Sequence, residues 1–172
     1  AGVLLWNHVY GTPSPSNAAP STPSAPVGPV SIAGAATLGA HDARVVLLEF
    51  SDFQCPFCGQ FARDTMPLVR REYVDTGRVR IVFRNLPLAI HEHAKQAAIY
   101  AECAARQGRF WPMHDKLFSN GSELDDTHLM TYATAAGLDI TLFHTCIAGR
   151  DAATAVDTDV AIARQLGLTG TP

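Results

Sequence analysis

The chain has 172 residues and is 47% hydrophobic, which is enough apolar material for the core of one domain. Its 13 basic and 16 acidic side chains give a net charge of −3, and this balance excludes the basic stripe that nucleic-acid binding needs. Only two of the four cysteines, Cys55 and Cys58, lie close together in the sequence. The central question is whether this pair carries out redox chemistry, holds a metal or staples the fold.

The N-terminal residues predict an attachment rather than a folded domain. Residues 1–10 begin with the apolar run AGVLLW, which we interpret as the end of a membrane anchor or signal segment, because a full span needs about 20 apolar residues. Residues 11–29 contain six prolines among Ser, Ala and Thr, a composition typical of an extended, semi-rigid tether. Because the chain begins with Ala1 rather than Met, we expect a longer precursor with an anchor upstream of the tether. A signal-peptide remnant followed by a spacer is the alternative.

From residue 30 onward, the sequence contains three strand patterns. VSIAG (30–34) predicts a short strand. RVVLLEF (44–50) is a nearly continuous apolar run, which predicts a strand that is buried on both faces of a sheet. RVRIVFRNL (78–86) predicts the next strand.

Two helical regions complete the pattern. Apolar residues at helical spacing predict a helix that begins after Pro56 and ends at Gly77, with a kink at Pro67, because proline removes an internal hydrogen bond. Residues 91–168 predict several further helices separated by turn-forming segments. The order strand, strand, helix, strand and helical block favours an α/β core with a helical insertion.

The cysteine pair lies at the start of the first predicted helix. Cys55 follows the strand 44–50 by a short loop, with Pro56 in the first helical turn. Unpaired backbone N–H groups and the positive end of the helix dipole converge there and stabilise a thiolate, so we expect the pKa of Cys55 to lie well below the free value of about 8.5. Cys58, one turn further along, is close enough to form a small disulfide and should be the less exposed thiol. This arrangement predicts redox chemistry, with Cys55 open to attack and Cys58 as the resolving thiol.

Zinc binding and a purely structural disulfide are the alternatives for this pair. A zinc site built on a Cys-x-x-Cys unit needs a second pair of ligands at short spacing. Cys103 and Cys146 are isolated single cysteines, and the HEH at 91–93 is not matched by another cysteine pair. We therefore predict no metal site and interpret His91 and His93 as a helix cap or as surface polar groups.

Four segments, in this order, carry a resemblance to a known family: VVLLEFSDFQCPFCGQF, FRNLPL, AECAARQGRFWPMHDKLF and LGLTGTP. They resemble the DsbA-like, thioredoxin-fold thiol–disulfide oxidoreductases of bacterial cell envelopes, and the likeness covers residues 30–172. The resemblance implies a thioredoxin-like core with a helical domain inserted at about residues 88–150. It also implies a cis-proline loop that faces the active-site cysteines, and Pro172, preceded by Thr171, matches that position.

The resemblance also implies a role for Glu49. In the family, an acid at this position lies beneath the cysteines and helps to move the proton of the buried thiol. The alternative is a strand-end glutamate that reaches solvent. The family continues beyond its cis-proline into two more core strands and a final helix, so we expect this chain to be truncated at Pro172. Without those strands, the strand 44–50 would lack a neighbour on one side.

Three residues around the cysteines are expected to contact substrate: Phe53, Phe57 and Thr171. The two phenylalanines flank the cysteines and, if exposed, would supply apolar contacts for unfolded chains. Phe57 stands where the family's best-known oxidant carries histidine, and it cannot donate a hydrogen bond to a thiolate. We therefore expect a reduction potential between about −270 mV, the value for thioredoxin, and about −120 mV, the value for DsbA.

Cys103 and Cys146 are interpreted as a second, structural disulfide. By helical spacing, Cys103 shares a face with Ile99 and Cys146 shares a face with Leu142, so both cysteines point inward within the helical block. Two buried free thiols are the alternative. In an oxidising compartment nearby thiols tend to pair, and some members of the family carry this second bridge.

Together these features predict a thiol–disulfide oxidoreductase that exchanges disulfides with envelope or secreted proteins, with oxidation as the favoured direction. A reductase or isomerase of the same fold and a non-catalytic redox-fold binding module are the alternatives. The redox-active disulfide 55–58 needs no further cofactor. The implied partners are unfolded or folding substrate proteins and a membrane redox partner that recycles the cysteines. The implied location is extracytoplasmic, in the periplasm or at the outer face of the cell membrane, with the domain tethered to the membrane.

Overall fold

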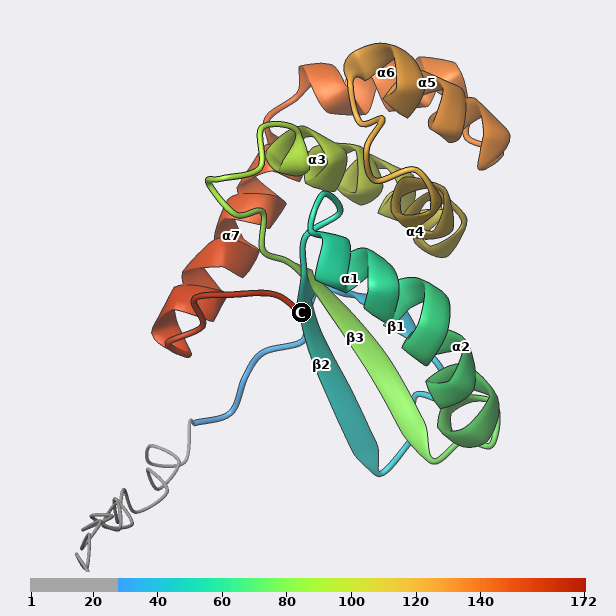
Figure 1. The fold of residues 1–172 in the computed structure, drawn as a ribbon, viewed down its shortest axis with the longest axis vertical. Helices are drawn as coiled ribbons and strands as arrows, with labels where there is room; N and C mark the ends of the chain where they lie inside the picture. Colours follow the sequence, from blue (N-terminus) through green and yellow to red (C-terminus); the bar gives the residue numbers. More distant parts are fainter. Residues whose placement is uncertain (1–27) are drawn as a thin grey trace, which may run out of the picture.

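The structure is a computed structural model, and it describes residues 28–172 (Figure 1). The expected anchor or signal segment at 1–10 lies outside the described residues, and so does the expected tether at 11–29 except for its last two residues. Within 28–172, no helix combines the length and the apolar character that crossing a membrane requires.

Three strands form one sheet in the order β1-β3-β2 (Figure 1): β1 (Ala36–Leu38), β2 (Val45–Ser51) and β3 (Val79–Asn85). β2 runs parallel to β3, with Leu47 opposite Ile81, and β1 runs antiparallel to β3. The central strand β3 is buried along almost its whole length, because it has a strand neighbour on each side and helices over its faces.

The strand predicted at 30–34 is wrong, because this segment turns before the sheet begins. Gly34 adopts a positive φ of 75°, a conformation that suits glycine and that no strand residue uses. The carbonyls of Ser31 and Ala33 accept hydrogen bonds from the side chain of Arg84, at 2.6 and 3.2 Å. A side chain from β3 therefore takes the carbonyls that a neighbouring strand would otherwise use.

The predicted burial of the strand 44–50 on both faces is wrong for its first half. Val45, Val46 and Leu47 are 55%, 42% and 36% exposed, whereas Phe50 is buried. Among the described residues, β2 is hydrogen-bonded to a strand on one side only, where it pairs with β3. β2 is thus an edge strand within the described residues, and the apolar side chains of its first half are in contact with solvent.

The predicted helix after Pro56 continues past Pro67 to Val74. It consists of α1 (Pro56–Gln60), η1 (Phe61–Thr65), α2 (Met66–Val69) and η2 (Arg70–Val74). The segments η1 and η2 are wider π-helical turns, in which each N–H reaches the fifth residue back instead of the fourth. The wider turn before α2 lets the helix pass a proline, which has no N–H to donate.

Five further helices follow β3: α3 (Ala94–Ala105), α4 (Phe110–Ser119), α5 (Asp126–Ala135), α6 (Ile140–Ala148) and α7 (Asp151–Gln165). In Figure 1, α3 to α6 lie together beyond the end of the sheet at which α1 begins, and α7 returns beside β2. The fold is thus an α/β thioredoxin-like core with a helical insertion, as the sequence predicts.

One main hydrophobic core joins the helical block to the cysteine loop. Most of its buried residues come from α3 to α6 and the segments that join them, and it also includes Phe53, Cys55, Cys58 and Phe83. On the other face of the sheet, Phe50 packs in a smaller cluster with residues of α7. The cysteine pair therefore lies at the seam between the sheet and the inserted helices.

A buried ion pair fastens α7 to β3. Arg84 and Asp159 are almost fully buried, and Arg84 Nη1 lies 2.5 Å from Asp159 Oδ1. The backbone N–H of Asn85 donates to Asp159 Oδ2 (2.9 Å), and Asn85 Nδ2 donates to Glu102 of α3 (2.7 Å). Burial, followed by the nearby Asp159 charge, raises the pKa of Glu102 to about 7. Moving α7 away from β3 would leave Arg84 and Asp159 as unpaired buried charges, which is costly. The cluster therefore favours one arrangement of α3 and α7 at the end of β3.

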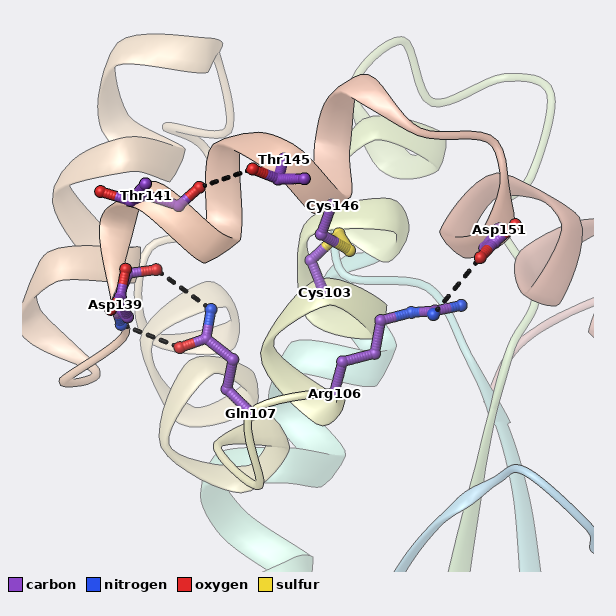
Figure 2. The surroundings of a disulfide bond; sticks show 8 residues. All are labelled: Cys103, Arg106, Gln107, Asp139, Thr141, Thr145, Cys146 and Asp151. Atoms are coloured by element: carbon purple, nitrogen blue, oxygen red, sulfur yellow. Dashed lines mark hydrogen bonds and ion pairs between the residues drawn. A yellow bond between two sulfur atoms is a disulfide. The ribbon is translucent and has the colours of Figure 1, made fainter.

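A disulfide joins α3 to α6 within the helical block. Cys103 and Cys146 are bonded, with their Cα atoms 5.7 Å apart, which is the pairing that the sequence analysis expects (Figure 2). Next to the bridge, the side chain of Gln107 exchanges two hydrogen bonds with the backbone of Asp139, at 3.1 and 2.8 Å. The end of α3 is thus held to the start of α6 by both covalent and hydrogen bonds.

Replacing Cys103 and Cys146 together by alanine should lower the free energy of unfolding by about 4 kcal/mol, because the bridge closes a 43-residue separation in the unfolded chain. Chemical denaturation of the oxidised protein measures this change. A variant with alanine at Cys55 and Cys58 retains only this bridge and serves as the control, since a reductant should destabilise it by the same amount. If neither the substitution nor the reductant changes the denaturation midpoint, the bridge does not stabilise the folded protein.

Candidate active site

The cysteine pair sits where β2 leads into α1. Cys55 is the residue directly before the helix, with an extended backbone (φ −72°, ψ 123°), and Pro56 is the first helical residue. The N–H of Gly59 donates to the Cys55 carbonyl (3.0 Å), and the N–H of Cys55 donates to the Asp52 carbonyl (3.1 Å). The strand, the loop and the helix therefore place Cys55 at the helix start and Cys58 one turn further into the molecule.

Both cysteines are free thiols in the structure, and they differ in exposure. Cys58 is 0% exposed and Cys55 is 5% exposed. The Cys55 Sγ atom lies 3.8 Å from the carbonyl oxygen of Thr171. The peptide bond between Thr171 and Pro172 is cis, so a cis-proline loop lies against the first cysteine.

The pKa of the Cys55 thiol lies below its usual value. Burial alone would raise it, but the polar groups beside the sulfur outweigh burial: first the side chain of Thr171, then Cys58 and the backbone of Phe57. The Thr171 hydroxyl makes no hydrogen bond within residues 28–172, so it is free to turn toward a Cys55 thiolate. The cis-proline loop thus adds to the acidity that the helix start supplies.

The pKa of the Cys58 thiol is shifted in the opposite direction. Burial raises it, while the side chains of Ser51 and Thr171 and the backbone of Asp52 offset only part of that effect. Within the pair, the thiolate is therefore favoured on Cys55 and the proton on Cys58.

Glu49 and Ser51 lie on the face of β2 opposite the one that packs toward α7. The Glu49 carboxyl is almost fully buried, and neither of its oxygens has a hydrogen-bond partner among the described residues. Burial raises its pKa to about 7, and the nearby Ser51 hydroxyl offsets this only in part. The same hydroxyl lowers the pKa of Cys58, so Ser51 lies close to both the buried acid and the buried thiol. The alternative of a solvent-reaching Glu49 is therefore wrong.

The two phenylalanines beside the cysteines have opposite surroundings. Phe57 is 69% exposed, whereas Phe53 is only 2% exposed. The Phe53 ring packs on Phe83 of β3 and Phe118 of α4, at centroid distances of 5.4 and 4.8 Å. The expectation that Phe53 contacts substrate is wrong, because its ring anchors the cysteine loop in the main core.

A cavity of about 590 Å³ opens beside Cys55. The cysteine loop and the start of α1 form one side of it, and residues 119–122, which lead from α4 toward α5, form another. A Cβ atom on Gly121 would come within 3.3 Å of the Phe53 carbonyl, so glycine allows this segment to approach the loop closely. Arg63 and His91 also line the cavity.

Asp52 and His91, which were not predicted from the sequence to lie in the site, hold the cysteine loop. The buried Asp52 carboxylate accepts hydrogen bonds from the backbone N–H groups of Gln54 (2.7 Å) and Leu88 (2.8 Å), and it lies 2.8 Å from His91 Nδ1. The position of Asp52, directly after a strand, was the one sequence feature that could have indicated this role. Its partners could not be predicted, because Leu88 and His91 lie 36 and 39 residues away in the sequence. Within residues 28–172, no group of three or more His, Cys, Asp or Glu side chains that could hold a metal ion occurs.

A family model and similar solved structures agree with this geometry. A thioredoxin family model matches residues 32–172. The chain is similar to alpha-DsbA1 of Wolbachia pipientis, with a TM-score of 0.72 and 26% identity over 80% of this chain and 72% of that one. It is also similar to oxidised BdbD of Bacillus subtilis, with a TM-score of 0.71 and 27% identity over 83% of this chain and 80% of that one.

Curated relatives of higher identity are described as Na(+)/H(+) antiporters. NhaA 3 of Salinispora tropica is 42% identical over 135 residues, which are 78% of this chain and 20% of the antiporter. NhaA 1 of Mycolicibacterium vanbaalenii is 41% identical over 106 residues, which are 61% of this chain and 17% of the antiporter. The chain thus spans about a fifth of the length of these relatives. The family model and the structural likeness show that the chain belongs to the thioredoxin-like DsbA family of thiol–disulfide oxidoreductases.

Proposed function

We propose that the chain exchanges disulfides with substrate proteins through Cys55 and Cys58, with oxidation of the substrate as the favoured direction. The observation that carries this proposal is the placement of the pair, with Cys55 at the helix start against the cis-proline loop and Cys58 fully buried one turn further along. This placement lowers the pKa of Cys55 and raises that of Cys58. A stabilised thiolate on Cys55 is a good leaving group, so a mixed disulfide at this sulfur is resolved readily.

In the oxidising direction, a substrate thiolate attacks the Cys55 sulfur of the 55–58 disulfide. A bond forms between the substrate sulfur and Cys55, the Cys55–Cys58 bond breaks, and its electron pair stays on Cys58, which takes up a proton. A second substrate thiolate then attacks the substrate sulfur of the mixed disulfide, and Cys55 leaves as a thiolate. The substrate has lost two electrons, and the protein holds the thiolate–thiol pair that its site favours.

Glu49 is suited to supply the proton that Cys58 takes up. Because its pKa is raised to about 7, this carboxyl is partly protonated at neutral pH and can give or accept a proton there. The Ser51 hydroxyl, which influences the pKa of both groups, offers a relay between them. In the reducing direction, the same groups would remove the proton from Cys58 before it attacks.

Phe57 and the cis-proline loop are proposed to contact the substrate. The Phe57 ring is largely exposed at the helix start, and Thr171 and Pro172 lie beside Cys55 with part of their surface open to solvent. We propose unfolded or folding proteins as substrates and a membrane redox partner that re-oxidises the cysteines. The proposed location is extracytoplasmic, as for other DsbA-family proteins, with residues 11–29 as the tether.

A second candidate is a redox module that acts within a larger membrane protein. The 42% identity to part of an antiporter favours it. Both candidates use the same cysteine chemistry and differ in the partner. Trapped mixed disulfides with many different proteins would support the first, and adducts with a single membrane protein would support the second.

Replacing the two cysteines one at a time should separate their roles. Cys55→Ser should abolish disulfide exchange, because the sulfur that substrates attack is gone. Cys58→Ser should accumulate mixed disulfides through Cys55, because no resolving thiol remains. Non-reducing gels and mass spectrometry of protein incubated with reduced and oxidised test substrates measure both effects. Adducts with Cys55→Ser but not with Cys58→Ser would reverse the assignment.

Replacing Glu49 by glutamine should change how stability depends on pH. The Glu49 pKa is raised from 4.5 to about 7 by folding, so its contribution is fully present below pH 4.5 and is lost as pH rises to about 7. Glu49→Gln should therefore remove a pH-dependent loss of about 3 kcal/mol in the free energy of unfolding. Denaturation curves across this pH range measure the change.

Glu102→Gln is the matched control for that experiment. Its carboxyl also has a pKa raised to about 7, but it lies at the end of β3, outside the cysteine site. Only Glu49→Gln should also slow exchange at neutral pH. Parallel stability curves for the wild type and Glu49→Gln would mean that Glu49 ionises normally in the folded protein.

A further inference from the structure

An aspartate–histidine pair beside the reactive cysteine takes no part in the steps described so far. The Asp52 side chain is 0% exposed and the His91 side chain is 17% exposed, and both lie on loops at the same end of the sheet. Asp52 Oδ2 lies 2.8 Å from His91 Nδ1. His91 and Cys55 line the same cavity, so a substrate sulfur that approaches Cys55 from this side meets the histidine ring.

Asp52 determines which ring nitrogen of His91 carries the proton. The carboxylate acts here only as an acceptor, because its two oxygens also accept the backbone N–H groups of Gln54 and Leu88. A neutral His91 therefore keeps its proton on Nδ1, where it donates to Asp52, and Nε2 holds a lone pair. The same hydrogen bond holds the orientation of the ring.

We propose that His91, positioned by Asp52, is a general base of the exchange reaction and takes the proton of a substrate thiol that enters the cavity. This inference rests on the proposed function. His91 Nε2 accepts the proton of the substrate S–H, leaving an imidazolium and a thiolate. The thiolate forms a bond to the Cys55 sulfur, the bond from Cys55 to Cys58 breaks, and its electron pair goes to Cys58. Because only a few per cent of an ordinary thiol is ionised at neutral pH, a base here supplies the attacking species.

The other groups around the cavity are compatible with this role. Besides His91, the charged or titratable side chains that line it are Cys55 at the helix start and Arg63 from η1. Asp52 contacts His91 but does not line the cavity. Residues 119–122 contribute only uncharged side chains. The Arg63 guanidinium, held by a hydrogen bond to the Phe118 carbonyl (3.1 Å), adds positive charge that favours a substrate thiolate once it has formed.

His91→Asn tests the proposal in the full chain, because asparagine retains an N–H donor for Asp52 and removes Nε2. The oxidised protein is mixed with a cysteine peptide, whose thiol has an ordinary pKa, and separately with an arylthiol that is already ionised at pH 7. The rate of the first exchange step is followed by stopped flow. We expect the peptide to react about tenfold more slowly at pH 7, with wild-type and variant rates converging above the thiol pKa of about 8.5. The arylthiol, which needs no base, should react at the wild-type rate.

His93→Asn is the matched control, since His93 lies on the same loop, and within residues 28–172 its side chain makes no hydrogen bond and does not line the cavity. It should leave both rates unchanged. Equal slowing of the peptide and the arylthiol by His91→Asn would overturn the proposal, because it would show that His91 only shapes the loop. Unchanged rates for both thiols would overturn it as well. A wild-type disulfide that reacts with neither thiol would instead refute the proposed exchange function itself.

Discussion

The pKa values of Cys55 and Cys58 shift in opposite directions because the two thiols occupy different positions at the start of one helix. Cys55, directly before the helix, keeps a small exposed surface, whereas Cys58, three residues later, is fully buried. The side chain of Thr171 and the groups at the helix start lower the pKa of Cys55, whereas burial raises the pKa of Cys58. The rest of the site maintains this difference. Phe53 anchors the loop between the sheet and α4, and Asp52 ties it to the segment that leads into α3. If these contacts did not hold the loop in place, the two thiols would not keep their different surroundings, and the difference between their pKa values would be lost.

In the proposed reaction, the buried acid and the histidine supply separate proton-transfer groups for the two sulfurs. Ser51 lies close to both Glu49 and Cys58, and in this proposal Glu49 and Ser51 serve the fully buried thiol. His91 lines the cavity on the side of Cys55, where a substrate thiol would arrive. Since disulfide exchange moves one proton at the attacking sulfur and another at the leaving sulfur, separate groups on the two sides fit the chemistry of both steps.

Features that depend on neighbouring residues could be predicted from the sequence. The strand before Cys55 and the helix after Pro56 follow from local patterns. The helix start predicts the direction of the Cys55 pKa shift, but the Thr171 side chain, 116 residues away, lowers that pKa most. Features that depend on distant partners could not. The segment 30–34 does not extend because Arg84, more than 50 residues away, takes its carbonyls. Phe53 is buried because aromatic rings from β3 and α4 meet it, and His91 joins the site only through Asp52. The cis-proline loop could be predicted only from the family resemblance, because the residues Gly-Thr-Pro by themselves indicate an ordinary turn.

The pH at which Cys55 loses its proton tests the opposite acidities most directly. The rate of iodoacetamide alkylation of the reduced wild-type protein is measured against pH, and the modified cysteine is identified by mass spectrometry. Alkylation should occur at Cys55 and reach half of its maximal rate well below the free-thiol pKa of about 8.5, while Cys58 remains unmodified in the same range. Half-maximal alkylation of Cys55 at or above about 8.5, or modification of Cys58 first, would contradict the thiolate–thiol pair on which the proposed chemistry depends.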